Sequence, residues 1–296
     1  MDRFESMRVF VAVAEAQGFA PAARRLSMSP PAVTRAVLAL EERVGARLFH
    51  RTTRVVRLTE SGARFLADCK RILADLEEAE VGAAGSHAEP RGQLCVTAPI
   101  MFGRMHVAPI VLDFLSRYPK VSARLLFRDS LVDLLDEGID VAVRIGHLPD
   151  SSLRAVQVGS VRRVVCASPA YLAARGAPRA PADLAQHELI ASSPGGEPTE
   201  WSFASGETIT PAARLTVSGS DVAIAAALAG RGIARVLSYQ VAPELRAGGL
   251  AIVLAEFEPP PLPVSLVSLE GPRAAAKVRA FVDYAVERLR ADPSLN

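Results

Sequence analysis

Residues 29 to 35 read Ser-Pro-Pro-Ala-Val-Thr-Arg and combine small side chains, hydroxyls and one guanidinium at the start of an amphipathic segment. Side chains of these types suit contacts with base edges and with phosphates in a DNA groove. The free N–H groups of a helix N-terminus also favour an anion such as phosphate. We expect Ser29 as the N-cap and Pro30 at the first helical position. The candidate contact residues of this segment are Ser29, Pro30, Pro31, Thr34 and Arg35.

A second basic group follows at residues 50–54, His-Arg-Thr-Thr-Arg, between two short apolar stretches. This arrangement predicts two short strands joined by a basic turn, as in the wing of a winged helix. Arg51 and Arg54 would then meet the minor groove, where the negative potential favours arginine. Simple solvation of both side chains is the alternative.

The charge balance points to the same end of the chain. Residues 1–60 hold ten arginines and six acidic residues, a balance of +4, and the whole chain carries +2, so the remainder sums to −2. A basic module joined to a slightly acidic one suggests a polyanionic partner for the first. Three alternatives stay open: a solvated basic surface, an ion pair of Arg35 with Glu41 or Glu42, and a neutral surface role for Thr34.

Apolar spacing predicts the elements that position these residues. Residues 4–14 form one helix, a second helix begins at Pro21, and a third begins after Ser29 and ends at Gly45. Two short helices joined by a tight turn make a helix-turn-helix, in which the first helix braces the second. The buried stripe of the third helix is expected to be Val33, Val37, Leu40 and Val44.

A long helix is predicted after Thr59. Its apolar positions alternate between spacings of three and four, which is typical of two-helix packing and predicts a dimer seam. The alternative is a helix that lies on the core of its own domain. A linker rich in glycine follows at residues 82–92. The seam residues are Leu66, Cys69, Leu73 and Leu76.

Beyond Gly92 the pattern alternates between strands and helices. Strands at 94–98, 121–127 and 141–145 enclose helices at 109–118 and 131–137, which predicts a parallel sheet. A second set begins with a strand at 163–167, and the chain ends in a helix at about 274–290. We expect three parts: 1–59 for DNA binding, 60–90 as linker and dimerisation helix, and 91–296 as a separate domain of strands and helices.

Residues 18–62 closely resemble the LysR-type regulators. The shared landmarks are A-A-x-x-L at 22–26, A-V-T-R at 32–35, L-E at 40–41, L-F-x-R at 48–51 and L-T-x-x-G at 58–62. Residues 133–153 and 277–283 resemble the CrgA-like branch of that family. The resemblance covers essentially the whole chain. Two positions depart from the family pattern: Ala20 replaces a usual Ser or Thr N-cap, and Pro30 replaces a common Gln.

The resemblance implies a mixed α+β and α/β fold. A winged helix-turn-helix and a long linker helix would precede a periplasmic-binding-protein-like (type 2) effector domain of two α/β subdomains. Subdomain I would span about 91–162 and 266–296, and subdomain II about 163–265. The implied function is sequence-specific transcription regulation controlled by a small molecule. The implied partners are double-stranded DNA, the effector, further copies of the chain as dimer or tetramer, and RNA polymerase.

The resemblance also places an effector at strand ends and helix starts, which are good anion sites. Arg144 motivates the expectation of an anion, although an ion pair with Asp129 or Asp150 is an equal alternative. Asp221 could instead serve as a helix cap. The candidate effector residues are Thr97, Pro99, Ile100, Met101, Arg144, Ile145, Gly146, Ser193, Pro194, Ser218 and Asp221.

The sequence offers little support for other classes of protein. It shows no nucleophile–base pair, and its five histidines are scattered without metal-ligand spacing, so we expect no enzyme, metal or cofactor. The absence of an 18-residue apolar run and of a signal pattern, with three widely separated cysteines, predicts a cytoplasmic protein without a membrane span. A solute-binding receptor domain with no DNA role is the alternative function.

Overall fold

The computed structural model describes residues 2–51, 56–83, 89–130, 134, 137–148, 153–193, 200–268 and 274–295. The chain divides into two compact units, Met1–Glu89 and Pro90–Asn296. The first unit contains α1 (Arg3–Glu15), α2 (Phe19–Arg25), α3 (Pro30–Val44), the hairpin strands β1 (Phe49–Arg51) and β2 (Val56–Leu58), and α4 (Glu60–Ala83).

The two helices of the predicted helix-turn-helix are present. α2 begins two residues earlier than expected because Gly18, in extended conformation, is its N-cap, so Ala20 lies inside the first turn. α3 begins at Pro30 as predicted, and it ends where Gly45 adopts a left-handed conformation with φ of +71°. Glycine reaches this conformation without the steric penalty that a Cβ would bring.

The core of the first unit holds α3 by one face. Val33, Val37 and Leu40 are buried against residues of α1 and α2, which confirms three positions of the predicted stripe. The fourth position was wrong, because Val44 is 41% exposed. Residues 42 to 45 are all exposed, so the last turn of α3 extends beyond the core. The buried position near this end belongs instead to Glu41.

Glu41 is a buried carboxylate that joins α3 to the wing. Its Oε1 accepts the backbone N–H groups of Leu48 at 2.8 Å and of Phe49 at 3.2 Å. The carbonyl of Leu48 accepts the N–H of Thr59, which immediately precedes α4. Gly62 lies directly over that carbonyl, where a Cβ would collide with the Leu48 oxygen. One corner of the chain therefore fixes α3, β1 and α4 together.

The second unit contains two five-stranded sheets. The helical segments of its first part are α5 (Ile100–Phe102), the π-helical turn η1 (Gly103–Val107), α6 (Ala108–Arg117) and α10 (Ala276–Arg290), followed by η4 (Pro293–Leu295). The first sheet has the order β4-β3-β5-β14-β6, with β3 (Gly92–Ala98), β4 (Val121–Phe127), β5 (Val141–Ile145), β6 (Arg154–Val161) and β14 (Leu262–Ser268).

The second sheet has the order β11-β8-β12-β7-β13. Its strands are β7 (Arg163–Ala167), β8 (Leu189–Ser192), β11 (Leu215–Val217), β12 (Ile233–Leu237) and β13 (Ala251–Val253). The remaining elements of this part are α7 (Pro169–Arg175), η2 (Pro181–Gln186), the small hairpin of β9 (Trp201–Ser202) and β10 (Thr208–Ile209), α8 (Ser220–Leu228), α9 (Ser238–Arg246) and η3 (Ala255–Phe257).

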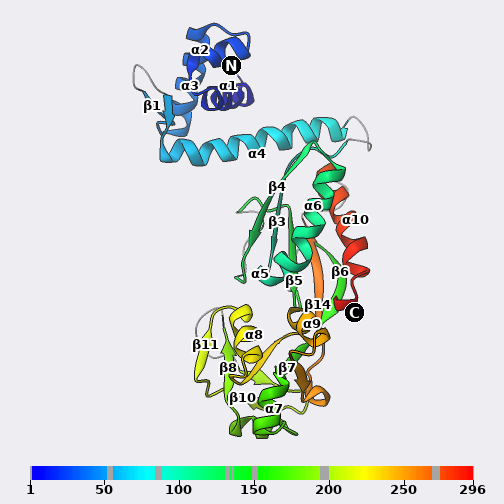
Figure 1. Cartoon of the computed structure of the whole chain (residues 1–296). Helices are drawn as coiled ribbons and strands as arrows, with labels where there is room; N and C mark the ends of the chain where they lie inside the picture. The colour runs from blue at the N-terminus through cyan, green and yellow to red at the C-terminus, as the bar shows by residue number, and fades with distance from the viewer. Residues whose placement is uncertain are drawn as a thin grey trace. The chain divides into compact units, whose positions relative to one another are not determined.

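Both sheets have the same directional pattern. Three neighbouring strands are parallel, β4-β3-β5 in one and β11-β8-β12 in the other, and an antiparallel strand follows, β14 or β7. We call the part around each sheet a lobe. α6 and α10 pack on each other and on the first sheet, and Figure 1 shows the second sheet with α7, α8 and α9 around it. The predicted parallel strands 94–98, 121–127 and 141–145 are present, whereas the helix expected at 131–137 lies largely outside the described residues.

β14 begins at Leu262 and pairs with β5 and β6, so residues 262–265 belong with the first lobe rather than the second. The bounds expected from the family resemblance placed that boundary near 265, because neither the resemblance nor apolar spacing gives a strand's sheet partners. The strand β6 was not anticipated at all. Its alternating burial is weak, and its pairing with β14 joins residues about a hundred positions apart.

Replacing Glu41 with Ala removes the acceptor for two buried N–H groups. Each unsatisfied buried donor costs roughly 1–3 kcal/mol, so we expect Glu41→Ala to lower the free energy of unfolding by about 2–4 kcal/mol. Denaturant titration followed by far-ultraviolet circular dichroism measures this loss. The matched control is Glu42→Ala on the exposed neighbour, with an expected change under about 0.5 kcal/mol. Equal losses in both variants would contradict the anchoring role.

Candidate DNA-reading face and effector lobes

The outward face of α3 carries the residues predicted to read DNA. Pro30, Pro31 and Arg35 are exposed and Thr34 is half-buried. The Thr34 hydroxyl donates to the Pro30 carbonyl at 3.0 Å. Ser29 precedes the helix as its N-cap, but its side chain makes no capping hydrogen bond. The structure thus brings all five residues to one end and one face of α3.

Arg35 makes no ion pair or hydrogen bond within the described part of the chain, so the pair with Glu41 or Glu42 is not formed. Glu41 is buried and faces the opposite way, toward Leu48 and Phe49. The guanidinium of Arg35 is therefore presented to solvent on the face that the core does not use. A planar guanidinium in this position suits bidentate contact with a base edge or a phosphate.

The wing is present as the antiparallel pair of β1 and β2, with His50 opposite Arg57. Both of these side chains are exposed. The two residues predicted to enter the minor groove are only partly covered by the structure. Arg51 ends β1, but its side chain lies outside the described residues, as does the whole of Arg54. Their DNA contacts stay a prediction.

Part of the predicted dimer seam on α4 packs against the core of the first unit itself. Cys69 is fully buried in the core of the first unit, so its assignment to a partner interface was wrong. Leu66 and Leu73 pack partly against the same core, and Leu76 is half-buried without belonging to it. Heptad spacing cannot separate a seam toward a partner from a seam toward the helix's own domain, which is why the prediction failed at Cys69.

An acidic side chain ties α4 to the helix-turn-helix. Glu15 of α1 pairs with Lys70 of α4 at 3.0 Å and with Arg25 of α2 at 2.8 Å. The bond from Lys70 is the largest influence and holds the pKa of the Glu15 carboxyl below its usual range. The pairs are partly exposed, so their contribution to stability is modest.

The candidate effector residues of the first lobe gather at one sheet edge. β3 and β5 are neighbouring parallel strands, so residues 97–101 and 144–146 follow the same edge. Ile100 is 50% exposed, and its N–H donates to Asp129 at 3.0 Å. Burial lowers the pKa of the Arg144 guanidinium. Thr97 was wrongly assigned, because it is fully buried and its hydroxyl donates to the Leu126 carbonyl at 2.6 Å.

The candidates of the second lobe also lie together. β8 and β11 are parallel and in register, and the N–H of Ser193 donates to the Val217 carbonyl at 2.8 Å, next to Ser218. Asp221 lies in the first turn of α8, where Gly219 is the N-cap, and its carboxylate accepts the N–H of Val222. Asp221 is thus a first-turn acid rather than the cap. Pro194 lies outside the described residues.

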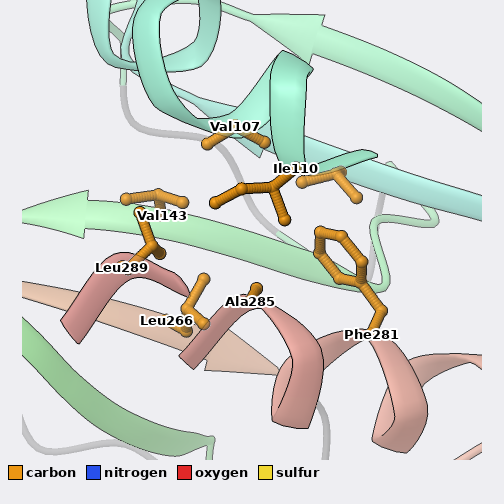
Figure 2. Close-up of a pocket in the computed structure, with 8 residues that line it drawn as sticks. Val107, Ile110, Val143, Leu266, Phe281, Ala285 and Leu289 are labelled. Carbon is orange, nitrogen blue, oxygen red and sulfur yellow. The ribbon is translucent and has the colours of Figure 1, made fainter. Parts of the chain in front are cut away.

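Met101 connects the two lobes, since its side chain packs partly against the apolar cores of both. A separate hollow among the described residues lies inside the first lobe. Figure 2 shows it between α6, α10 and the sheet, lined by side chains such as Ile110, Val143 and Phe281. These apolar side chains leave no room for a water molecule, so this hollow is a packing seam of the core. It contains none of the candidate effector residues.

Two further groups at the junction of the lobes were missed from the sequence. At the crossover between β6 and β7, Arg162 pairs with Glu258 at 2.7 Å, and Glu258 lies on the return crossover toward β14. Ser238 at the start of α9 bonds both backbone groups of Arg162. The only sequence signal was the position of Arg162 at the expected boundary between subdomains.

The second missed group is centred on His106 in the π-helical turn η1. Its ring contacts Phe102 at 4.7 Å and Tyr239 of α9 at 5.5 Å between centroids. Its Nδ1 bonds Asp292 at 2.9 Å, whereas its buried Nε2 has no hydrogen-bond partner among the described residues. Burial lowers the pKa of His106 despite the opposing effect of Asp292. A π turn changes the side-chain register of a helix, and periodicity of 3.6 does not reveal it.

Comparison with known proteins identifies the family to which this chain belongs. The profile of the LysR substrate binding domain matches residues 87–290, and that of the bacterial regulatory helix-turn-helix proteins of the lysR family matches residues 4–63. The chain belongs to the LysR family of transcriptional regulators. The match over residues 4–63 sets aside a solute receptor without a DNA role.

Relatives support the LysR assignment over nearly the full length. An HTH-type transcriptional regulator of Xanthomonas campestris is 36% identical over 291 residues, 96% of this chain and 85% of the relative. The regulator CrgA of Neisseria meningitidis is 33% identical over 288 residues, 96% of each protein. The solved structure of CrgA covers 96% of this chain and 98% of its own, with a TM-score of 0.63. That of the Vibrio cholerae virulence activator AphB is 26% identical, covers 97% and 99%, and has a TM-score of 0.61.

The predicted family, fold class and function are thus confirmed: a LysR-type regulator with a helix-turn-helix and an effector-binding domain. Within the described residues, no cluster of three His, Cys, Asp or Glu side chains has the arrangement of a metal site. Of the helices in the same residues, none has the length and apolar character needed to cross a membrane. Cys69, Cys95 and Cys166 are buried free thiols.

The lowered pKa of His106 gives this regulator a defined pH dependence. The unfolded chain takes up a proton near pH 6.5, whereas the folded chain keeps His106 neutral to lower pH. The stability from this neutral burial is therefore fully present above pH 6.5 and is lost as pH falls below it. We expect the free energy of unfolding of wild type to fall, relative to His106→Gln, by up to about 1.4 kcal/mol per pH unit in this range.

Denaturant titrations between pH 7.5 and 5 measure the difference in slope between wild type and His106→Gln. The exposed His147 provides the control variant His147→Gln, which should keep the wild-type slope. Parallel pH profiles for wild type and His106→Gln would show that His106 is not the group responsible.

Proposed function

We propose that this LysR-type regulator reads its operator by laying α3 in the major groove. The contacts come from Ser29, Pro30, Pro31, Thr34 and Arg35, while Arg51 and Arg54 of the wing reach the adjacent minor groove. The observation that carries this proposal is the division of α3 into a face held by the core and an outward face on which Arg35 has no partner among the described residues. A braced helix with one free basic face is the geometry that groove reading requires.

The same proposal includes a dimer, because two copies of α3 can read two half-sites about one helical turn, or a multiple of it, apart. α4 supplies the contact through the parts of Leu66, Leu73 and Leu76 that its own core leaves accessible. Leu76 is the clearest of these, since it does not belong to the core of the first unit. Residues 60–90 would then join the DNA-binding part, 1–59, to the effector domain, 91–296, and dimers would pair into tetramers.

For the effector, we propose a small anionic molecule bound between the lobes of residues 91–296. Pro99, Ile100, Met101, Arg144, Ile145 and Gly146 would contribute from one lobe, and Ser193, Pro194, Ser218 and Asp221 from the other. Support comes from the gathering of these residues at two sheet edges and from Met101, which packs against both lobes. The effector shifts DNA binding by its differential affinity for two conformations, typically ~1–3 kcal/mol.

We further infer that the protein works in the cytoplasm, acts by binding rather than by catalysis, and communicates with RNA polymerase at its promoters. The basic character of the first unit supports contact with DNA in that compartment. Ten arginines with described side chains are exposed there: Arg3, Arg8, Arg24, Arg25, Arg35, Arg43, Arg47, Arg57, Arg64 and Arg71.

Arg35→Ala tests the proposed reading of DNA. Loss of a guanidinium that contacts a base should weaken specific binding by about 1–3 kcal/mol. The assay is fluorescence anisotropy of the full-length chain with a duplex selected from a randomised library, compared with an unrelated duplex. Arg43→Ala, also exposed but in the last turn of α3, is the control and should cost far less. Wild-type affinity in Arg35→Ala would overturn the assignment.

Leu76→Asp tests the proposed dimer. A carboxylate in the apolar contact between two α4 helices has no partner, so we expect the variant to sediment at the mass of the next smaller assembly. Analytical ultracentrifugation of the full-length chain makes the measurement, and circular dichroism checks the fold. Ala67→Asp, at an exposed position of the same helix, should keep the wild-type mass. A folded Leu76→Asp variant of unchanged mass would refute the contact.

A further inference from the structure

The outward face of α3 between Pro30 and Ala39 has few hydrogen-bond donors. Pro30 and Pro31 are the first two residues of α3, and proline has neither a polar side chain nor a backbone N–H. The hydroxyl hydrogen of Thr34 is already donated to the Pro30 carbonyl. Between Pro30 and Ala39, Arg35 is therefore the one residue whose side chain can donate a hydrogen bond to DNA.

An exposed leucine continues this face. Leu38 is 44% exposed. It follows Arg35 by three residues, Thr34 by four and Pro31 by seven. These spacings put all four residues on one side of the helix. The opposite side is the buried stripe that holds α3 in the core. Between Pro30 and Ala39, α3 thus presents to solvent one guanidinium, two proline rings, a leucine side chain and a threonine whose hydroxyl hydrogen is already donated.

This chemistry discriminates between bases. In the major groove, guanine and adenine present polar atoms and cytosine presents an amino group, whereas thymine adds an apolar C5-methyl group. A polar base edge that is buried against leucine loses its water without gaining a partner, which is unfavourable. A thymine methyl against leucine is favourable, because apolar surface leaves water on both sides.

We propose that Leu38, with Thr34 beside it, reads thymine methyl groups in the operator, and that Arg35 supplies the one polar base contact between Pro30 and Ala39. This inference rests on the proposed placement of α3 in the major groove and specifies what that placement selects. Each half-site then contains a thymine whose methyl group contacts Leu38, close to the base that Arg35 contacts.

The test combines a protein change with a single-methyl change in DNA. The probe is the duplex that the full-length chain selects from a randomised library, remade with each thymine in turn replaced by deoxyuridine, which lacks only the methyl. We expect wild type to bind about fourfold more weakly at one position of a half-site, which corresponds to ~0.8 kcal/mol for one buried methyl-sized group. Leu38→Ala should bind the thymine duplex more weakly and show no further loss with deoxyuridine at that position.

Variants of Thr34 separate its methyl from its hydroxyl. Thr34→Val keeps a methyl and removes the hydroxyl, so we expect near wild-type affinity. Thr34→Ser keeps the hydroxyl and removes the methyl, so we expect up to a fourfold loss. Leu112→Ala, which removes a leucine 65% exposed on α6, is the control for nonspecific effects and should keep the full sensitivity to deoxyuridine.

Three outcomes would overturn the proposal. Wild type that is indifferent to every deoxyuridine substitution would exclude methyl reading, and so would Leu38→Ala that keeps the full sensitivity. The reverse order of the Thr34 variants would assign the contact to the hydroxyl. In each of these cases the chain still binds its selected duplex. Failure to enrich any sequence from the library is a different result, and it would overturn the proposed DNA reading together with this inference.

Discussion

The burial of the Glu41 carboxylate is the interaction on which the DNA-facing part of this regulator depends. Burying a carboxylate costs free energy unless hydrogen-bond donors replace the lost water. Here the backbone N–H groups of Leu48 and Phe49 donate to it. Leu48 and Phe49 lie at the start of the wing, and the carbonyl of Leu48 lies against Gly62 in the first turn of α4. The reading helix, the wing and the linker helix consequently have one shared anchor. We therefore expect a change at this corner to affect all three elements, whereas a change on the outer face of α3 leaves this anchor intact.

The helix-turn-helix was predictable because its signals are local. The Ser29-Pro30 start, the Gly45 end and the apolar spacing of Val33, Val37 and Leu40 each lie within one turn of the feature they specify. Predictions failed where a partner from a distant segment decides the outcome. Cys69 has the spacing of a dimer seam, but it is buried in the core of its own unit. Thr97 has the position of a ligand contact, but its hydroxyl donates to the carbonyl of Leu126. The ion pair at the junction of the lobes could not be predicted for the same reason, since Arg162 and Glu258 are 96 residues apart.

The lobes are joined in a way that suits a domain with two arrangements. Only two crossovers connect the sheets, and the Arg162–Glu258 pair ties one crossover to the other. Tyr239 extends from α9 of the second lobe into the core of the first, beside Phe102 and His106. Polar bonds at the crossovers and the contact of Tyr239 with Phe102 and His106 form a small junction between the lobes. The proposed effector would shift the balance between two arrangements of the lobes through this junction.

The insertion of β14 between β5 and β6 has a consequence for synthesis on the ribosome. The second lobe is continuous in sequence, from β7 to β13, and all of its strands emerge before residue 262. The first lobe has β3, β4, β5 and β6 early, yet its sheet closes only when β14 arrives, and α10 covers it later still. Until then β5 and β6 present unpaired strand edges, which are templates for aggregation. We therefore expect the later-encoded lobe to fold first, and nascent chains that stall before residue 268 to be the species that chaperones must protect.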